Sequence, residues 1–177
     1  MNGMNEYGNA LFLLASEEGT VETVKGDLDI ACTAIEENPD YIKLLDTPAV
    51  AKEERLSLIN EAFCSLHYSV KNLIMMLCEK RIVYTLSDIR RSFSVLYDEH
   101  FGIERVEAVT AVALTEAQTE ALTKKLVAMT GKTIVIKNTV KPEILGGVML
   151  RYSGIQLDGS VKSRLDSFSE SLKNLNL

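Results

Sequence analysis

The sequence has few of the residues from which metal and nucleophilic sites are built. Its three cysteines, Cys32, Cys64 and Cys78, are far apart and form no Cys-x-x-Cys pair, which argues against zinc and redox sites. Each lies in or beside an apolar helical stripe, so we expect three small buried residues. His67 and His100 have no partner at metal-ligand spacing and are expected at the surface or at helix ends. No Ser-His-Asp order or carboxylate pair stands out, so no catalytic residue, metal or cofactor is predicted.

Long apolar runs and clustered positive charge are also missing. The longest apolar stretches, such as residues 73–78, are far shorter than the run of about 18 that a transmembrane helix needs. The N-terminus lacks the basic start and apolar run of a secretory signal, and Glu6, Glu17 and Glu18 argue against a transit peptide. A net charge of -6 argues against a nucleic-acid surface. The 177 residues therefore predict a bacterial cytoplasmic protein with one domain or two small ones.

Residues 1 to about 104 are predicted to form six helices with short loops, which is typical of a compact bundle. Asn38-Pro39 should end the second helix, because proline cannot continue it. Thr20 and Ser69 are predicted N-caps, and residues 52–55 are expected on the solvent side. Apolar residues recur at helical spacing as Tyr7, Ala10, Leu11 and Leu14; Val21, Val24, Leu28, Ala31, Cys32 and Ile35; Tyr41, Leu44 and Leu45; Leu56, Ile59, Phe63 and Leu66; Val70, Leu73, Ile74, Leu77 and Cys78; and Leu86, Ile89, Phe93 and Leu96.

The pattern changes near Gly102, where alternation and β-branched residues predict strands. A capping-box pattern, Thr115 to Gln118, opens a helix that Gly131 should close. Asp158 is expected to cap a last helix. The predicted strands are residues 105–114, 132–140, 145–152 and 155–157, the first helix should bury Leu122, Leu126 and Met129, and the last should bury Val161, Leu165, Phe168 and Leu172. The predicted fold is therefore α+β, a six-helix bundle over residues 1–104 and a small β-α-β-β-β-α domain over residues 105–177.

Gly146 and Gly147 fall within a strand-like run. Glycine in such a place indicates a bulge or a close approach of two backbone segments. A phosphate-binding loop is a poor alternative, since no Gly-Lys-Ser/Thr follows the pair.

Four segments carry a family resemblance when they are taken in order. They are residues 7–19, which begin Tyr-Gly-Asn-Ala-Leu-Phe; residues 45–55; residues 72–89; and residues 142–165, which contain Pro-Glu-Ile-Leu-Gly-Gly-Val-Met-Leu-Arg and then Ile-Gln-Leu-Asp-Gly-Ser-Val-Lys-Ser-Arg-Leu. Together they resemble the delta subunit of bacterial F-type ATP synthases, a family that includes the mitochondrial oligomycin-sensitivity-conferring protein. Two positions depart from the usual family pattern. Gly8 replaces the usual Ala, and Arg81-Ile82-Val83 replaces Gly-Arg-Leu, which should stiffen that turn or join the helices differently.

The resemblance implies a non-catalytic connector in the peripheral stalk. The helical domain would bind N-terminal segments of the alpha subunits, and the C-terminal domain would bind the far ends of the b subunits. The connector would hold the catalytic head still during proton-driven rotary ATP synthesis. It would be present in one copy per complex at the cytoplasmic face of the bacterial membrane, and it would touch the membrane only through the complex. No nucleic acid, cofactor or metal is implied.

The resemblance also places an alpha-binding groove between the first and fifth helices. Its candidate residues are Tyr7, Leu11, Leu14, Ile74, Met75, Met76 and Leu77. Residues 73–78 are apolar on every side of the helix, so some apolar surface should remain after the core is built. The two methionines either suit an adaptable groove or fill gaps in the core, and both interpretations stay open. The candidate residues for binding b lie on the last helix and tail: Phe168, Leu172, Leu175 and Leu177.

Two other classes of function compete with the connector. A free-standing helical adaptor or regulator would explain the helical half but not the C-terminal segment. A small α+β enzyme would use Asp158, Arg151 or Arg164 in a cleft, but the sequence offers it no nucleophile, base or cofactor loop.

Overall fold

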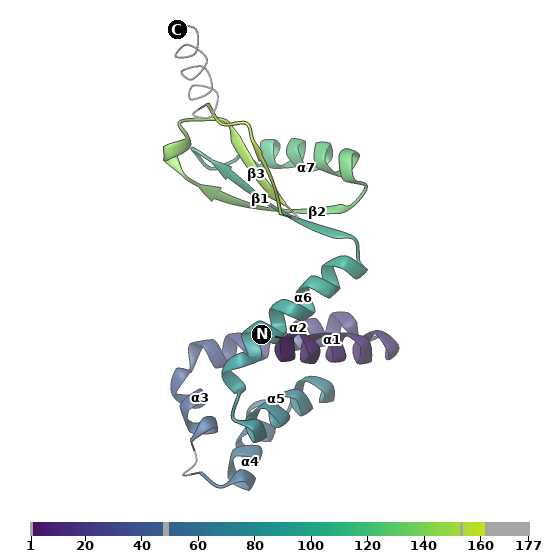
Figure 1. Cartoon of the computed structure of the whole chain (residues 1–177), viewed down its shortest axis with the longest axis vertical. Helices are drawn as coiled ribbons and strands as arrows, with labels where there is room; N and C mark the ends of the chain where they lie inside the picture. The colour runs from purple at the N-terminus through teal and green to yellow at the C-terminus, as the bar shows by residue number, and fades with distance from the viewer. Residues whose placement is uncertain (1, 48–49, 153, 162–177) are drawn as a thin grey trace, which may run out of the picture. The chain divides into compact units, whose positions relative to one another are not determined.

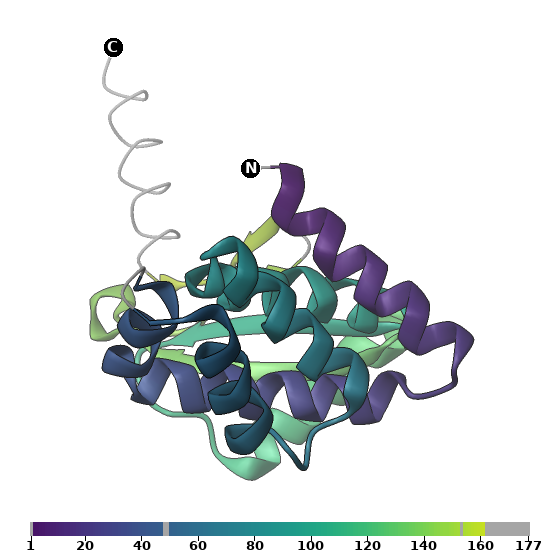
Figure 2. The ribbon, with the colours of Figure 1, turned by 90° about the horizontal axis from the view of Figure 1, so that it is seen from below.

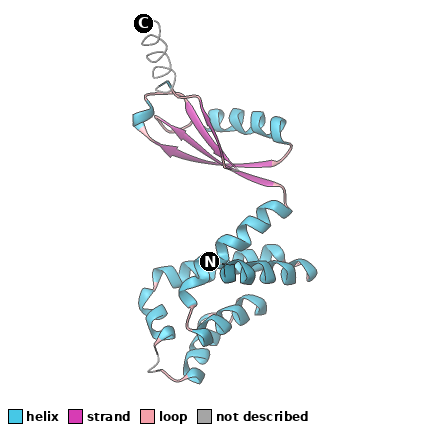
Figure 3. Ribbon diagram, viewed as in Figure 1, coloured by secondary structure: helices cyan, strands magenta, loops and turns pink. Residues whose placement is uncertain are grey.

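The computed structural model divides the chain into two compact units, Met1–Asp98 and Glu99–Leu177. It describes residues 2–47, 50–152 and 154–161. The first unit is helical and the second holds a small mixed sheet (Figures 1 and 3), which confirms the predicted α+β class. Within the described residues, no helix has the length and apolar character needed to cross a membrane.

The described residues of the helical part form six α-helices, as predicted. They are α1 (Asn2–Glu17), α2 (Val21–Glu37), α3 (Pro39–Asp46), α4 (Lys52–Ala62), α5 (Tyr68–Lys80) and α6 (Leu86–His100), with a short 3-10 helix, η1 (Val83–Thr85), before α6. Pro39 begins α3 directly after α2 ends, where its fixed backbone angle suits a first helical turn.

The apolar stripes of these helices meet in one core. Every residue of the predicted α2 stripe, Val21 to Ile35, is buried. Phe12 of α1 packs edge-to-face on Phe93 of α6, with ring centroids 5.5 Å apart. Figure 2 shows the helices of this unit, coloured purple to teal, gathered in one bundle. Burying this apolar surface is the main favourable term in the stability of the unit.

Arg55 overturns the expectation that residues 52–55 all face solvent. Its side chain is only 5% exposed. One guanidinium nitrogen donates hydrogen bonds to the carbonyl oxygens of Leu45, at 2.8 Å, and of Cys78, at 3.5 Å. These carbonyls lie near the C-terminal ends of α3 and α5, where backbone acceptors have no helical donor left. Arg55 therefore joins three helices from inside the core.

Several other local expectations were wrong. Val161, which the last helix was expected to bury, is 43% exposed. The hydroxyl of Thr20 makes no capping bond to α2, and α5 is capped by His67, whose ring accepts a hydrogen bond from the Ser69 backbone. Cys64 is exposed, whereas Cys32 and Cys78 are buried as predicted. Met129 is 74% exposed and does not join the buried face of its helix.

Burial has a chemical consequence for Cys32. Its thiol is packed in the helical core and donates weakly to the carbonyl of Leu86. Burial raises the pKa of Cys32 to about 12, because a thiolate is poorly solvated there.

The second unit is built on a four-stranded sheet with strand order β2-β1-β3-β4. β1 pairs in parallel with β2 and antiparallel with β3, and β3 pairs antiparallel with β4. The elements, in chain order, are β1 (Ile103–Thr110), α7 (Glu116–Thr130), β2 (Thr133–Val140), a 3-10 turn η2 (Pro142–Ile144), β3 (Val148–Tyr152) and β4 (Ile155–Asp158). The predicted strand at 145–152 therefore begins later, at Val148.

Helix α7 is the crossover between the parallel strands and covers one face of the sheet (Figure 1). Its predicted capping box is present: Thr115 accepts from the Gln118 backbone, and Gln118 accepts from the Thr115 backbone. Gly131 ends the helix in the left-handed region, as predicted. Leu126 packs with Val106, Ala108, Ile134 and Leu150 in the core between helix and sheet.

The Gly146–Gly147 pair allows the close backbone approach that the sequence indicated. A Cβ atom on Gly147 would lie 2.4 Å from the carbonyl oxygen of Gly159, so no other residue fits. The neighbouring Val161 N–H donates to the carbonyl of Gly146 at 3.0 Å. Asp158 accepts a hydrogen bond from the Ser160 N–H at 2.9 Å, and this bond lowers the pKa of Asp158. The rest of the predicted last helix lies outside the described residues.

Candidate functional site

Helices α1 and α5 lie side by side in opposite directions, joined by a polar contact at each end. At one end, the Lys80 ammonium donates to the Tyr7 hydroxyl at 2.6 Å and lies 5.2 Å from the centre of the Tyr7 ring. At the other end, the Tyr68 hydroxyl donates to the Glu18 carboxylate, a bond that raises the pKa of Tyr68. We call the surface between these two contacts the α1–α5 seam.

Three of the residues predicted for an alpha-binding groove are buried in the core and present no surface to a partner. Leu11 is 5% exposed, and Ile74 and Leu77 are 0% exposed. Their place follows from helical geometry, because the core needs the same apolar residues at the same spacing as a binding face does.

Leu14 and Met76 are the predicted residues that stay exposed, at 39% and 42%. Leu14 lies four residues before Glu18, and Met76 lies four residues before Lys80, so each shares a helix face with a seam contact. The seam therefore has an exposed apolar side chain on each of its two helices.

Tyr7 and Met75 are half-buried and pack against the core. Met75 is about 100° round the helix from Met76. It precedes by four residues Glu79, which pairs with Lys52 of α4 at 3.1 Å. Met75 thus lies toward α4, and the two methionines have different environments.

The sequence interpretation missed the charged ends of the seam and one exposed leucine. Lys80 and Glu18 are surface residues of ordinary type, and no periodic pattern marks them as partners of Tyr7 and Tyr68. Leu13 is 62% exposed and lies on the outer side of α1, because one helical step turns its side chain about 100° from Leu14. The described residues contain no group of three or more His, Cys, Asp or Glu side chains able to hold a metal ion.

A sequence profile of the family described as ATP synthase delta (OSCP) subunit matches residues 4–172. The chain belongs to this family. The ATP synthase subunit delta of Lactobacillus johnsonii is 33% identical over 172 residues, covering 95% of this chain and 93% of the relative. The subunit delta of Clostridioides difficile is 30% identical over 173 residues, covering 97% and 96%. A chain of the Toxoplasma gondii mitochondrial ATP synthase hexamer shares the fold, with a TM-score of 0.73, 22% identity and coverage of 97% and 98%.

Gly8, where the delta family usually has alanine, lies at a close contact between α1 and α6. A Cβ atom on Gly8 would lie 2.7 Å from the Cβ of Ser92 and 3.2 Å from the carbonyl oxygen of Ile89. Neither neighbour is the end of a flexible side chain. The missing methyl group is therefore what lets the two helices approach this closely.

Arg81, where the family usually has glycine, keeps the glycine conformation. Its φ and ψ are 57° and 43°, in the left-handed region. The Arg81 N–H donates to the carbonyl of Cys78, and the Ile82 N–H donates to that of Leu77, which together make a Schellman motif. The helices are thus joined as a glycine would join them, and Lys80 stays in place at the end of the seam.

Proposed function

We propose that this chain is the delta subunit of a bacterial F-type ATP synthase, a non-catalytic connector in the peripheral stalk. The helical unit binds an N-terminal segment of an alpha subunit at the α1–α5 seam, and the sheet unit binds the ends of the b subunits. One copy works in each complex, at the cytoplasmic face of the membrane. The observation that carries the proposal is the family match, which spans both units in one run, residues 4–172.

The seam suits an amphipathic helix for physical reasons. Leu14 and Met76 offer apolar contact on both helices, and an unbranched methionine can adjust to its partner. The polar contacts Tyr7–Lys80 and Tyr68–Glu18 place a positive group at one end of the seam and a negative group at the other. A helix with apolar side chains at i, i+3 and i+4 can cover the apolar centre while its flanking polar groups meet these ends.

The test is a calorimetric titration of the full chain with a synthetic peptide from the N-terminus of the same organism's alpha subunit. We expect saturable binding of one peptide per chain. Leu14→Glu and Met76→Glu should each weaken binding by at least about tenfold, because docking would strip water from a carboxylate. Leu13→Glu is the matched control, with the same change on an outward position of the same helix, and should leave the affinity within about twofold of wild type.

Two results would count against the proposal. Equal weakening by Leu13→Glu and Leu14→Glu would mean that added negative charge, not the seam, controls the affinity. The absence of both heat and chemical-shift changes at high peptide concentration would remove the alpha-binding role. The predicted b-binding residues, Phe168, Leu172, Leu175 and Leu177, lie outside the described residues and stay predictions.

A further inference from the structure

Helix α7 covers only part of its own side of the sheet. It packs mainly against β2, which is one edge strand, whereas β4 is the other edge strand. Leu157 of β4 is paired with the core residue Leu150, and Ile155 is paired with Tyr152. Because residues directly opposite one another point to the same face of a sheet, Leu157 and Ile155 lie on the α7 side. They are 44% and 51% exposed, so β4 presents apolar side chains to solvent beside α7.

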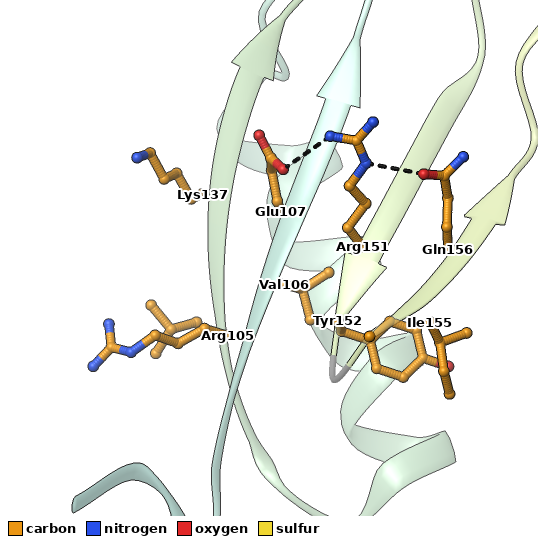
Figure 4. A pocket seen from close by; sticks show the side chains of 10 residues that line it. Arg105, Val106, Glu107, Lys137, Arg151, Tyr152, Ile155 and Gln156 are labelled. Atoms are coloured by element: carbon orange, nitrogen blue, oxygen red, sulfur yellow. Dashed lines mark hydrogen bonds and ion pairs between the residues drawn. The ribbon is translucent and has the colours of Figure 1, made fainter. Parts of the chain in front are cut away.

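The two faces of β4 differ in chemistry. Gln156 points away from the α7 side and accepts a hydrogen bond from Arg151 at 3.1 Å, and Arg151 pairs with Glu107 at 3.6 Å (Figure 4). Figure 4 also shows Tyr152 and Ile155 side by side. Removing apolar surface from water is favourable. The α7-side face of β4 therefore gains from a cover, whereas the polar face is suited to solvent.

A hollow of about 540 Å³ continues this apolar surface, between the first half of α7 and the start of β3. Among the described residues that line it, Lys125 is the only charged one. Glycine in such a wall allows a neighbouring segment to approach the backbone closely. The lining includes Leu114, Leu122 and Val148, and three glycines, Gly146, Gly147 and Gly159.

The hollow and the apolar face of β4 meet where β4 ends. Gly159 directly follows β4, and its N–H donates to the carbonyl of Val148 at 3.0 Å. We call the combined surface the α7–β4 groove, and define it by Leu122, Val148, Ile155, Leu157 and Gly159.

The chain reaches one end of this groove at Val161. The Val161 N–H donates to the carbonyl of Gly146, which lines the hollow, at 3.0 Å. Residues 162–177 therefore begin at the rim of the groove and need no linker to reach it. A segment tethered this closely has an effective concentration in the millimolar range. That exceeds the concentration of a second copy or a separate partner in an ordinary solution, so the chain's own segment is the favoured occupant.

The sequence of this segment suits the groove in pattern and in length. Val161, Leu165, Phe168 and Leu172 follow at spacings that put them on one face of a helix. Val161 to Leu172 is eleven helical steps, or about 17 Å. Gly159 back to Ile155 is four strand steps, or about 13 Å. The apolar face of a helix that ran back along β4 would therefore cover the strand from end to end.

We propose that residues 162–177 form a helix that turns back and packs in the α7–β4 groove of the isolated chain. Phe168 covers Leu157, and Leu172 covers Ile155. The α7 side of the sheet then carries two helices, one over each half.

This contact has a consequence for the predicted b-binding residues, although it does not depend on the proposed function. Phe168 and Leu172 cannot fill the groove and bind a b subunit at the same time. If the proposed function holds, the groove is an internal competitor that b must displace from these two side chains.

The experiment uses tryptophan fluorescence of the full chain, which has no tryptophan of its own. Phe168→Trp places one on the apolar stripe. Ser167→Trp is the matched control, because the preceding residue points about 100° away round the helix. We expect the Phe168→Trp variant to emit at a shorter wavelength than the control. Acrylamide should quench it at least about threefold less, since only undocked chains expose the ring.

Substitutions in β4 test whether the groove is what covers the ring. In the Phe168→Trp chain, Leu157→Ser should raise quenching toward the level of the control. Gln156→Ser makes a polar change on the opposite face of the same strand and should leave quenching unchanged. Leu157→Ala is milder and guards against misfolding. It should give an intermediate rise in quenching at an unchanged melting temperature.

Three results would overturn the proposal. Equal quenching of Phe168→Trp and Ser167→Trp would mean that the stripe is not covered. Equal responses to Leu157→Ser and Gln156→Ser would mean that the cover is not the groove. A wavelength shift that disappears on dilution would make the occupant a second copy of the chain. None of these results bears on the titration with the alpha peptide, so the proposed function would stand or fall separately.

Discussion

Replacing Arg81 with glycine should stabilise the helical unit. Arg81 ends α5 in the left-handed region, which costs a non-glycine residue about 1–2 kcal/mol. Glycine avoids this cost. It also gives the unfolded chain more conformational freedom, which lowers the free energy of unfolding by about 0.4–1 kcal/mol. The Arg81 side chain makes no hydrogen bond or ion pair with the described residues, so little is lost with it. The net gain should be about 0.5–1 kcal/mol.

Thermal unfolding followed by circular dichroism at a helix-sensitive wavelength measures this gain. For a unit of this size, Arg81→Gly should raise the melting temperature by about 2–8 °C. Arg81→Ala is the control, because it removes the same side chain and keeps the left-handed cost. The reasoning is refuted if Arg81→Gly is no more stable than Arg81→Ala, since the turn would then store no backbone strain.

Two further substitutions test the helical core by urea unfolding. Arg55→Ala should lower the free energy of unfolding by about 2–4 kcal/mol, through lost charged hydrogen bonds and a cavity, whereas Arg55→Met keeps the volume and should cost clearly less. Equal costs would mean that packing around the side chain is unimportant. Gly8→Ala should lower the free energy of unfolding by about 1 kcal/mol, as its clash with Ser92 outweighs the better helix propensity. A double-mutant cycle with Ser92→Gly should return a favourable coupling of about 1 kcal/mol, and a coupling near zero would locate the clash elsewhere.

Much of the fold could be predicted because its pattern repeats. The α2 stripe from Val21 to Ile35 has a helical period sustained over several turns, and every member is buried. The capping box at Thr115 and the turn at Gly131 depend on near neighbours in sequence, so the sequence contains all of their partners. Strand order is different, because it depends on which distant segments pair. The sequence indicated strands near β1 and β2 but not their parallel register.

The error at Arg55 arises because its partners are far away in the sequence. Arg55 has the type of a surface residue, but two carbonyl groups from other helices meet it in the core. At the candidate site, sequence alone could not tell which apolar residues of a helix are buried and which are exposed. Leu11 and Leu14 are identical in type and three residues apart, yet only Leu14 keeps substantial exposure. A core face and a binding face of a helix use the same residue types at the same spacing. Only the packed structure therefore shows which residue belongs to which face.

The short connection between α6 and β1 determines how the chain would respond to tension. Only Phe101 and Gly102 separate the two elements, and two residues reach at most about 7 Å when pulled straight. The connection therefore has almost no slack. Beyond it, β1 pairs with β2 along its whole length, from Ile103 to Thr110, and with β3 on its other side. A pull along β1 would strain these hydrogen bonds in shear, many at once and not one after another. A connector built in this way would therefore extend little under load.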